Sequence, residues 1–442
     1  MLLGTRFTNV WRWWTSPTIS TSHAFHFNAR FLTSSQLETS SSSLLVDNVL
    51  STTETDDVFL PWLERKSNTR ISSVLSIGKS DIGRFLFASE TIRAGDCILK
   101  VPFNVQISPD MLPSPIRDLL GDEIGNVAKV ALVILLEQKL GSDSKWAPYI
   151  IRLPKPWEMH NTIFWSEREL EMIRKSSLYE ESLNQRSQIE REFLAIKQVS
   201  DLLQLIIFAL ETFPEIVDSI NCDDFMHACA LGMLILLRRK LLLEHGEAQR
   251  VTLWYSFIPF ADFLNHDGAS KSLVLNDDDK QLSEVIADRD YAPGEHVLIR
   301  YGKYSNATLM LDFGFALPYN IHDQVLVQIK TVEDDPLARR KLELWQRSCT
   351  STTKYVNGIY FPGNSFTIRG LPQSLRAFAR ILSCTSPQEL NDLCTEAANG
   401  DGRLARIPLK NLNREVEAHQ ILLSQFKQLV EEYEASIEVL AL

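Results

Sequence analysis

The sequence contains few cysteines, and none of them lies in a disulfide or metal-binding pattern. There are 6 cysteines among 442 residues, none in the C-x2-C spacing. No group of cysteine and histidine residues has the spacing of a zinc site. Nothing therefore points to a small secreted protein held together by disulfides. We expect reduced thiols packed in a hydrophobic core, and no bound metal.

Long hydrophobic runs are also absent. A helix that spans a bilayer needs about 20 consecutive apolar residues. The longest run, Ala228–Leu237, has about half that length and is followed by Arg238-Arg239-Lys240. We interpret this run as a buried helix and expect no membrane association.

The sequence has no excess of positive charge. Its 45 lysines and arginines are outnumbered by 56 aspartates and glutamates, which gives a formal net charge of −11. Proteins that bind nucleic acid usually carry a basic patch for the phosphates, so we expect no nucleic-acid partner. A basic protein substrate is electrostatically better matched.

Acidic residues are missing from the first 37 residues, which contain Arg6, Arg12 and Arg30 and many serines and threonines; the first acid is Glu38. A basic, hydroxyl-rich segment without acids is typical of an organellar transit peptide. We therefore predict a leader and linker over residues 1–57 and a location in a plastid or mitochondrion. The alternative is a disordered tail on a cytoplasmic or nuclear protein.

The hydrophobic pattern of the remaining chain changes several times. After a short helical lead-in at Val58–Leu63, strands are expected at Ser72–Ile77, Arg84–Ala88 and Cys97–Val101. Helices are expected at Ile124–Leu140, Ser187–Phe213 and Asp223–Leu243. Strands return at Ser256–Pro259, Ser272–Leu275, Ser283–Ala287 and His296–Arg300. The final part is mainly helical and ends in an amphipathic stretch over Asn413–Leu440.

This order predicts an α+β fold, in which strands are interrupted by a long helical insertion and followed by a helical tail. A doubly wound sheet would instead alternate strands and helices. A Rossmann-type fold would also need an early glycine-rich turn inside a βαβ unit, and no such turn is present.

A glycine-containing turn at Gly78–Phe85 superficially resembles a phosphate-binding loop. The pattern fails because Arg84 and Phe85 stand where lysine and serine or threonine are required. Gly83 can let backbone amides approach a ligand closely, since it carries no side chain. A purely structural turn explains the same residues equally well.

The segment Asp262-Phe-Leu-Asn265-His266-Asp267 places polar residues directly after an apolar run. Because buried polar groups need partners, such a cluster at a strand end faces either a ligand or a turn. An Asx turn formed by Asn265 and Asp267 is an equally good interpretation. A third is a metal site with Asp262, His266 and Asp267 as ligands.

Tyr301 follows the last expected strand and stands beside Gly302, and Leu311–Phe315 comes a helical step later. A tyrosine at a strand end can pack in the core or present its hydroxyl to a reacting group. The residues alone leave both interpretations open.

Together, these motifs resemble a known family. Arg84–Ala88, the Asn265-His266 pair and Tyr301 occur in the order of the SET domain. The Asp-x-x-Asn-His segment, the Ser-Asn-Ala after the tyrosine and the Asp-Phe-Gly-Phe segment are similar to one class, that of Rubisco large-subunit lysine methyltransferase and actin-histidine methyltransferase. The resemblance implies short β-sheets with a pseudoknot.

The resemblance also implies domain boundaries. Residues 58–322 would form the SET domain, with a helical insertion at about 109–255. Residues 323–442 would form an all-α substrate-binding domain. The expected molecule is a monomer.

The class uses S-adenosyl-L-methionine as cofactor, and the resemblance assigns residues to it. The backbone of Ile82, Gly83 and Arg84 would lie on the methionine end. Asn265 and His266 would hold the methionine moiety and adenine, with Asp262 supporting the turn.

Catalysis would depend on Tyr301, whose hydroxyl would lie near the transferring methyl group and contribute to cofactor binding. Phe313 would line the substrate channel, where the class usually has tyrosine. The implied activity is protein-lysine N-methylation, with protein-histidine methylation as a variant. The alternatives are a SET-fold binding protein with weak or lost catalysis and a metal-dependent hydrolase that uses Asp262, His266 and Asp267.

One departure from the class concerns the helix before Asp262. The class carries a Ser-Arg pair there, and its arginine binds the cofactor carboxylate. This chain has Leu234–Arg239 instead. Arg238 or Arg239 could replace that arginine only if the helix end were displaced.

Overall fold

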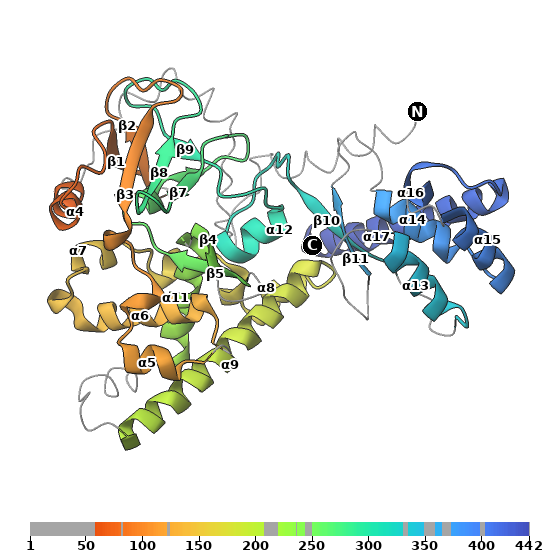
Figure 1. Ribbon diagram of the computed structural model, residues 1–442, viewed down its shortest axis with the longest axis horizontal. Coiled ribbons are helices and arrows are strands. Elements are labelled where there is room, and N and C mark those ends of the chain that lie inside the picture. Colours follow the sequence, from red (N-terminus) through yellow and green to blue (C-terminus); the bar gives the residue numbers. More distant parts are fainter. Residues whose placement is uncertain are drawn as a thin grey trace.

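The computed structural model describes residues 58–80, 83–121, 124–206, 220–235, 237–243, 250–329, 335–348, 359–364, 373–397 and 403–441. In Figure 1 a larger mixed α/β part lies on the left and a smaller, mainly helical part on the right. Each part has its own cluster of buried apolar side chains. The predicted leader and linker over residues 1–57 lie outside the described residues.

The larger part begins with α4 (Phe59–Ser67) and a set of short strands. These strands are β1 (Leu75–Ser80), β2 (Gly83–Ala88), β3 (Cys97–Pro102), β7 (Val274–Asp277) and β8 (Leu282–Ile286). β1 and β2 form an antiparallel hairpin, and β3 pairs with β8, which pairs with β7. Buried and half-buried residues alternate along β8, which is the period-two pattern of a strand with one covered face.

Helices separate β3 from the later strands, as the sequence predicted. They are α5 (Ser114–Leu119), α6 (Asn126–Leu140), α7 (Ala147–Ile150), α8 (Glu167–Met172), α9 (Ser177–Ile206) and α11 (Cys222–Ile235). α6 lies in the centre of this group, and its residues 130–135 are all buried. A helix that is apolar on all sides must be covered by its neighbours, and α11 packs against it.

The expected helix at Asp223–Leu243 is wrong in its second half. α11 ends at Ile235, and β4 (Leu237–Leu243) pairs antiparallel with β5 (Arg250–Ser256). A leucine-rich run fits a buried strand as well as a helix, so its periodicity does not separate the two. The valine, threonine and aromatic residues of β5 favour extended structure and provide the strand partner.

Two very short strands connect the motifs that the sequence analysis singled out. β6 (Asn265–His266) pairs in parallel with β9 (Leu298–Ile299). Their ladder places His266 opposite Ile299, just before Tyr301. α12 (Asn306–Thr308) and a π-helical turn at Leu309–Phe313 follow.

The C-terminal part is mainly helical, but the prediction that it is all-α is wrong. β10 (Gln324–Ile329) pairs antiparallel with β11 (Ile359–Asn364). The alternation of polar and apolar residues in Gln-Val-Leu-Val-Gln-Ile is a strand pattern. The helices are α13 (Ala338–Ser348), α14 (Gln373–Leu382), α15 (Pro387–Ala397), α16 (Arg403–Arg406) and α17 (Leu412–Ala441). Among the described residues, no helix has the length and apolar character to cross a membrane.

Candidate active site

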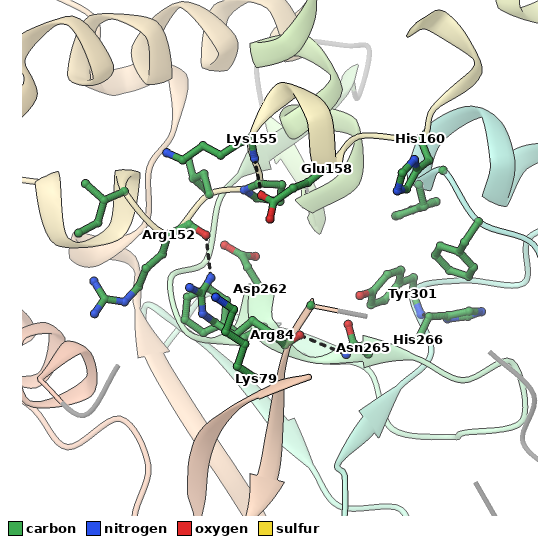
Figure 2. Close-up of a pocket in the computed structure, with 18 residues that line it drawn as sticks. Lys79, Arg84, Arg152, Lys155, Glu158, His160, Asp262, Asn265, His266 and Tyr301 are labelled. Carbon is green, nitrogen blue, oxygen red and sulfur yellow. Dashed lines mark hydrogen bonds between the residues drawn. The ribbon is translucent and has the colours of Figure 1, made fainter. Parts of the chain in front are cut away.

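A cavity of about 390 Å³ lies where the hairpin β1–β2 meets the helical insertion and the motif segments. Its volume is within the range of small-molecule sites. Its walls come from the hairpin, from residues 151–160, from residues 262–266, from Tyr301 and from residues 313–315. Figure 2 shows these side chains converging on one space from segments far apart in the sequence.

The structure brings together the site residues that the sequence analysis named. The lining includes Gly83, Arg84, Asp262, Asn265, His266, Tyr301 and Phe313. Ile82 lies outside the described residues. The individual roles assigned to these residues stay predictions, whereas their common location is a feature of the structure.

Hydrogen bonds fix the hairpin against the Asn265-His266 strand. Gly83 opens β2 with a φ of 117°, a conformation that glycine adopts without steric cost. The Asn265 side-chain amide donates from Nδ2 to the carbonyl oxygen of Arg84 at 3.3 Å. Asn265 thus joins the two segments and does not cap its own backbone.

His266 is held in one orientation by the backbone of Tyr301. The Tyr301 N–H donates to Nδ1 of His266 at 3.0 Å, so the ring carries its proton on Nε2. Burial lowers the pKa of His266 from 6.5 to about 4, although Asp267 acts in the opposite direction. His266 is therefore a neutral, oriented group at neutral pH.

The lowered pKa of His266 predicts a loss of stability in acid. Between pH 6.5 and 4 the unfolded chain binds a proton at His266 that the folded chain does not. The free energy of unfolding therefore decreases as the pH is lowered through this range. Below about pH 4 both states are protonated, and the loss levels off at about 3 kcal/mol. Denaturant unfolding of the wild type and of His266→Gln across this pH range measures the loss in the free energy of unfolding. Identical pH slopes in the two proteins would contradict the prediction.

The Tyr301 hydroxyl points into the cavity and is bound at its base. It donates to the carbonyl oxygen of Leu264 at 2.7 Å. Burial raises the pKa of Tyr301 far above its usual value, with a smaller contribution from Asp262, so the hydroxyl stays neutral. Its ring lies 5.2 Å from that of Phe313 and 5.0 Å from that of His266. Since its proton is directed to Leu264, the oxygen can accept a contact from a ligand.

Asp262 also lines the cavity, and Figure 2 shows it near the centre of the site. Its Oδ2 accepts a hydrogen bond from the Tyr149 hydroxyl at 2.6 Å. Burial raises the pKa of Asp262 well above its usual value, although the bond from Tyr149 opposes this rise. Its Oδ1 is buried and has no hydrogen-bond partner among the described residues. Such an atom at a cavity wall is well suited to accept a hydrogen bond from a bound ligand.

The turn before Asp262 is strained. Phe260 is fully buried and has a φ of 77° with a ψ of −48°. A bulky residue in this region costs on the order of 1–3 kcal/mol, and such outliers concentrate at functional sites. The sequence offered no signal for this strain, because phenylalanine is not typical of such a turn.

The metal-site interpretation finds no support in the side-chain geometry. Asp262 is bound to Tyr149, and Nδ1 of His266 faces the backbone of Tyr301. Asp267 caps the N–H of Ala269 through Oδ1 at 2.9 Å, which is an Asx turn. In the described ranges no group of three or more histidine, cysteine, aspartate or glutamate residues could hold a metal ion.

The sequence analysis missed one wall of the cavity. The segment from Ile151 to His160 contributes Arg152, Lys155 and Glu158 among others. This segment belongs to the helical insertion, and only tertiary packing carries it to the site. The one local signal is its pair of prolines: Pro154 lies in the loop after α7, and Pro156 begins a short 3-10 helix at Pro156–Glu158.

The helix that lacks the Ser-Arg pair ends before the two candidate arginines. α11 stops at Ile235, and Arg238 and Arg239 belong to strand β4, opposite Tyr255 and Trp254. The positions of their side chains lie outside the described part of the chain. The helix therefore does not carry these arginines, because the backbone is extended at both residues.

Comparison with solved structures defines the class of fold. The chain superposes on the crystal structure of the SET domain of LSMT bound to lysine and AdoHcy with a TM-score of 0.59 and 20% identity. The match covers 88% of this chain and 92% of that one. The chain therefore has the fold of this LSMT SET-domain structure, and the predicted α+β class is confirmed.

Comparison with sequences points to particular relatives. Residues 332–441 match the family described as Rubisco LSMT substrate-binding. The chain is 27% identical over 320 residues to the ribulose-1,5-bisphosphate carboxylase/oxygenase large subunit N-methyltransferase, chloroplastic, of Nicotiana tabacum, covering 68% of this chain and 59% of that protein. It is 26% identical over 333 residues to the human actin-histidine N-methyltransferase, covering 73% of this chain and 51% of that protein. The chain thus spans less than two thirds of the length of these relatives.

Proposed function

We propose that this chain is an S-adenosylmethionine-dependent protein N-methyltransferase that acts on lysine. The observation that carries the proposal is the Tyr301 hydroxyl. It is fixed on the Leu264 carbonyl at 2.7 Å and directed into a cavity that Asn265 and His266 also line. The similarity to lysine and histidine methyltransferases supports the same reaction class.

The residues present fit this cofactor. A nucleoside joined to an amino acid needs aromatic surface, hydrogen-bonding groups and room for a chain with opposite charges. The cavity offers Phe263, Phe313 and Phe315, and the neutral ring of His266. The buried Oδ1 of Asp262 has no hydrogen-bond partner among the described residues, so it can accept a hydrogen bond from the ammonium group of the cofactor.

The residues around Tyr301 can align a methyl transfer. When bound, S-adenosylmethionine supplies a methyl group on a sulfonium, which is a good leaving group. Tyr301 and the rings near it would then fix the approach of the attacking nitrogen, and alignment alone can lower a barrier substantially. Tyr301 acts as an orienting acceptor and not as a base, because its phenol stays protonated. The aromatic rings favour a neutral substrate amine by excluding water.

The pH dependence of the rate tests this proposal and identifies the nucleophile. A lysine amine has a reference pKa of about 10.4, so only a small fraction is neutral at pH 7. We expect the single-turnover rate to rise about tenfold per pH unit between about pH 7 and 9. The measurement uses methyl-labelled cofactor and a tissue extract, and mass spectrometry identifies the modified residue. A wild-type protein that binds no cofactor in calorimetry would leave the binding-protein alternative.

Histidine methylation is the second candidate, because Phe313 stands where the class usually has tyrosine. Phe313 packs between Tyr301 and Tyr304, with ring centroids at 5.2 and 5.7 Å. An apolar wall there suits an imidazole, because most of an imidazole is already neutral at neutral pH, whereas a lysine ammonium must first lose a proton. A histidine target, with a reference pKa of about 6.5, would give a rate that levels off above about pH 7.5. The same pH profile therefore separates the two targets.

We also infer a plastid location and a monomeric enzyme with a protein substrate. The basic, acid-free composition of residues 1–37 supports a transit peptide, and the tobacco relative is chloroplastic. Imaging a fluorescent-protein fusion of residues 1–57 tests the location. A diffuse cytoplasmic signal would contradict it.

A further inference from the structure

We infer that the side chain of Arg84 binds the carboxylate of the cofactor. This inference rests on the proposed function and concerns the guanidinium group, whereas the resemblance assigned only the backbone of this residue. S-Adenosylmethionine carries a carboxylate at the end of a short aliphatic chain from its sulfonium. The cavity must therefore hold an anion close to, but apart from, the site of methyl transfer.

The cavity is divided into a cationic end and an aromatic end. Lys79, Arg84, Arg152 and Lys155 line it. Figure 2 shows these residues on one side, with Tyr301 and His266 on the opposite side. If Tyr301 marks the transferring methyl group, the anionic end of the cofactor faces the cationic side.

Arg84 is the cation whose position best suits this task. Its Nη1 donates to the carbonyl oxygen of Arg152 at 2.8 Å, as the dashed line in Figure 2 shows. Its guanidinium carbon lies 5.1 Å from the centre of the Phe263 ring. Both contacts fix the group before a ligand arrives, which reduces the entropy lost on binding.

Two of the other cations, Arg152 and Lys79, are placed differently. The Arg152 guanidinium donates from Nη1 to the Pro148 carbonyl and lies 4.9 Å from the ring of Phe59. Figure 2 shows it directed away from the centre of the cavity. Lys79 is exposed and adds positive potential in a well-solvated position.

The chemistry of arginine matches a carboxylate at this place. A guanidinium carries five N–H donors in a planar fork, so it can keep its bond to Arg152 and also bind a carboxylate. It stays charged when partly buried. Two carboxyl groups, Asp262 and Glu158, also line the cavity. Burial raises the pKa of Asp262 well above its usual value, and Oε2 of Glu158 accepts the backbone N–H of Lys155 at 2.8 Å.

The test compares S-adenosylmethionine with decarboxylated S-adenosylmethionine, which keeps the sulfonium and the ammonium. Calorimetry on the full chain measures both affinities for the wild type, Arg84→Met and Arg84→Lys. Arg117→Met is the matched control, because it removes the same charge from an exposed arginine that pairs with Asp110. Thermal unfolding checks that every variant is folded.

We expect Arg84→Met to weaken S-adenosylmethionine about ten- to a hundredfold, as for a lost hydrogen bond to a charged group. Its affinity for the decarboxylated compound should be unchanged, and Arg84→Lys should be intermediate. Arg117→Met should change neither affinity. An equal loss for both compounds, or no loss, overturns the role of Arg84 alone. A wild type that binds neither compound overturns the proposed function and, with it, this inference.

Discussion

Replacing Tyr301 with phenylalanine is expected to slow methyl transfer about a hundredfold or more, the usual cost of losing one oriented polar group at a reacting centre. Affinity for the cofactor should change little, because the ring and its contacts with His266 and Phe313 remain. The lost bond to the Leu264 carbonyl should cost about 1 kcal/mol of stability. Single-turnover transfer of a labelled methyl group, with calorimetry on the same protein, measures both quantities.

Tyr291→Phe is the matched control for this experiment. The Tyr291 hydroxyl also donates a partly buried hydrogen bond, to Oδ1 of Asp288 at 3.0 Å, but Tyr291 does not line the cavity. Its loss should leave the rate unchanged. A Tyr301→Phe protein with the wild-type rate would remove Tyr301 from the mechanism. A large loss of affinity instead of rate would make Tyr301 a binding residue.

The part of the site that the sequence could predict is carried by local order. Asn265-His266 and Tyr301 end neighbouring segments, and the parallel pairing of β6 with β9 brings those ends together. A strand end next to a glycine or an asparagine is visible in the sequence as an abrupt change from apolar to polar residues. The structure explains why that pattern mattered: the polar atoms bond to each other and to the cavity wall.

The part that could not be predicted depends on tertiary packing. Arg152, Lys155 and Glu158 reach the cavity because the insertion folds back over β2, and no periodic pattern encodes that contact. The strand β4 has a leucine-rich sequence that fits a helix equally well, and only its pairing with β5 decides the matter. The strain at Phe260 also arises from surrounding packing, which over-determines the backbone there.

In the C-terminal part, replacing Arg380 with methionine is expected to cost about 3–5 kcal/mol, the penalty for leaving a buried charge without its partner. Arg380 is 3% exposed and donates from Nε to Glu415 at 2.8 Å. It also donates to the second carboxylate oxygen and, from Nη1, to the carbonyl of Leu404. Burial would raise the pKa of Glu415, but the bonds from Arg380 lower it, so the carboxylate stays charged. One side chain thus joins α14, α16 and α17.

Hydrogen exchange of the α14 and α17 amides in the full chain measures this loss locally. Arg339→Met is the control, because Arg339 is 92% exposed and its pair with Glu343 should contribute less than about 1 kcal/mol. The double variant Arg380→Met/Glu415→Leu should recover much of the stability, since it leaves no buried charge. Cofactor affinity should stay unchanged in all three variants, because Arg339, Arg380 and Glu415 do not line the cavity. Unaltered exchange in Arg380→Met would mean that packing alone, and not this ion pair, holds the helices together.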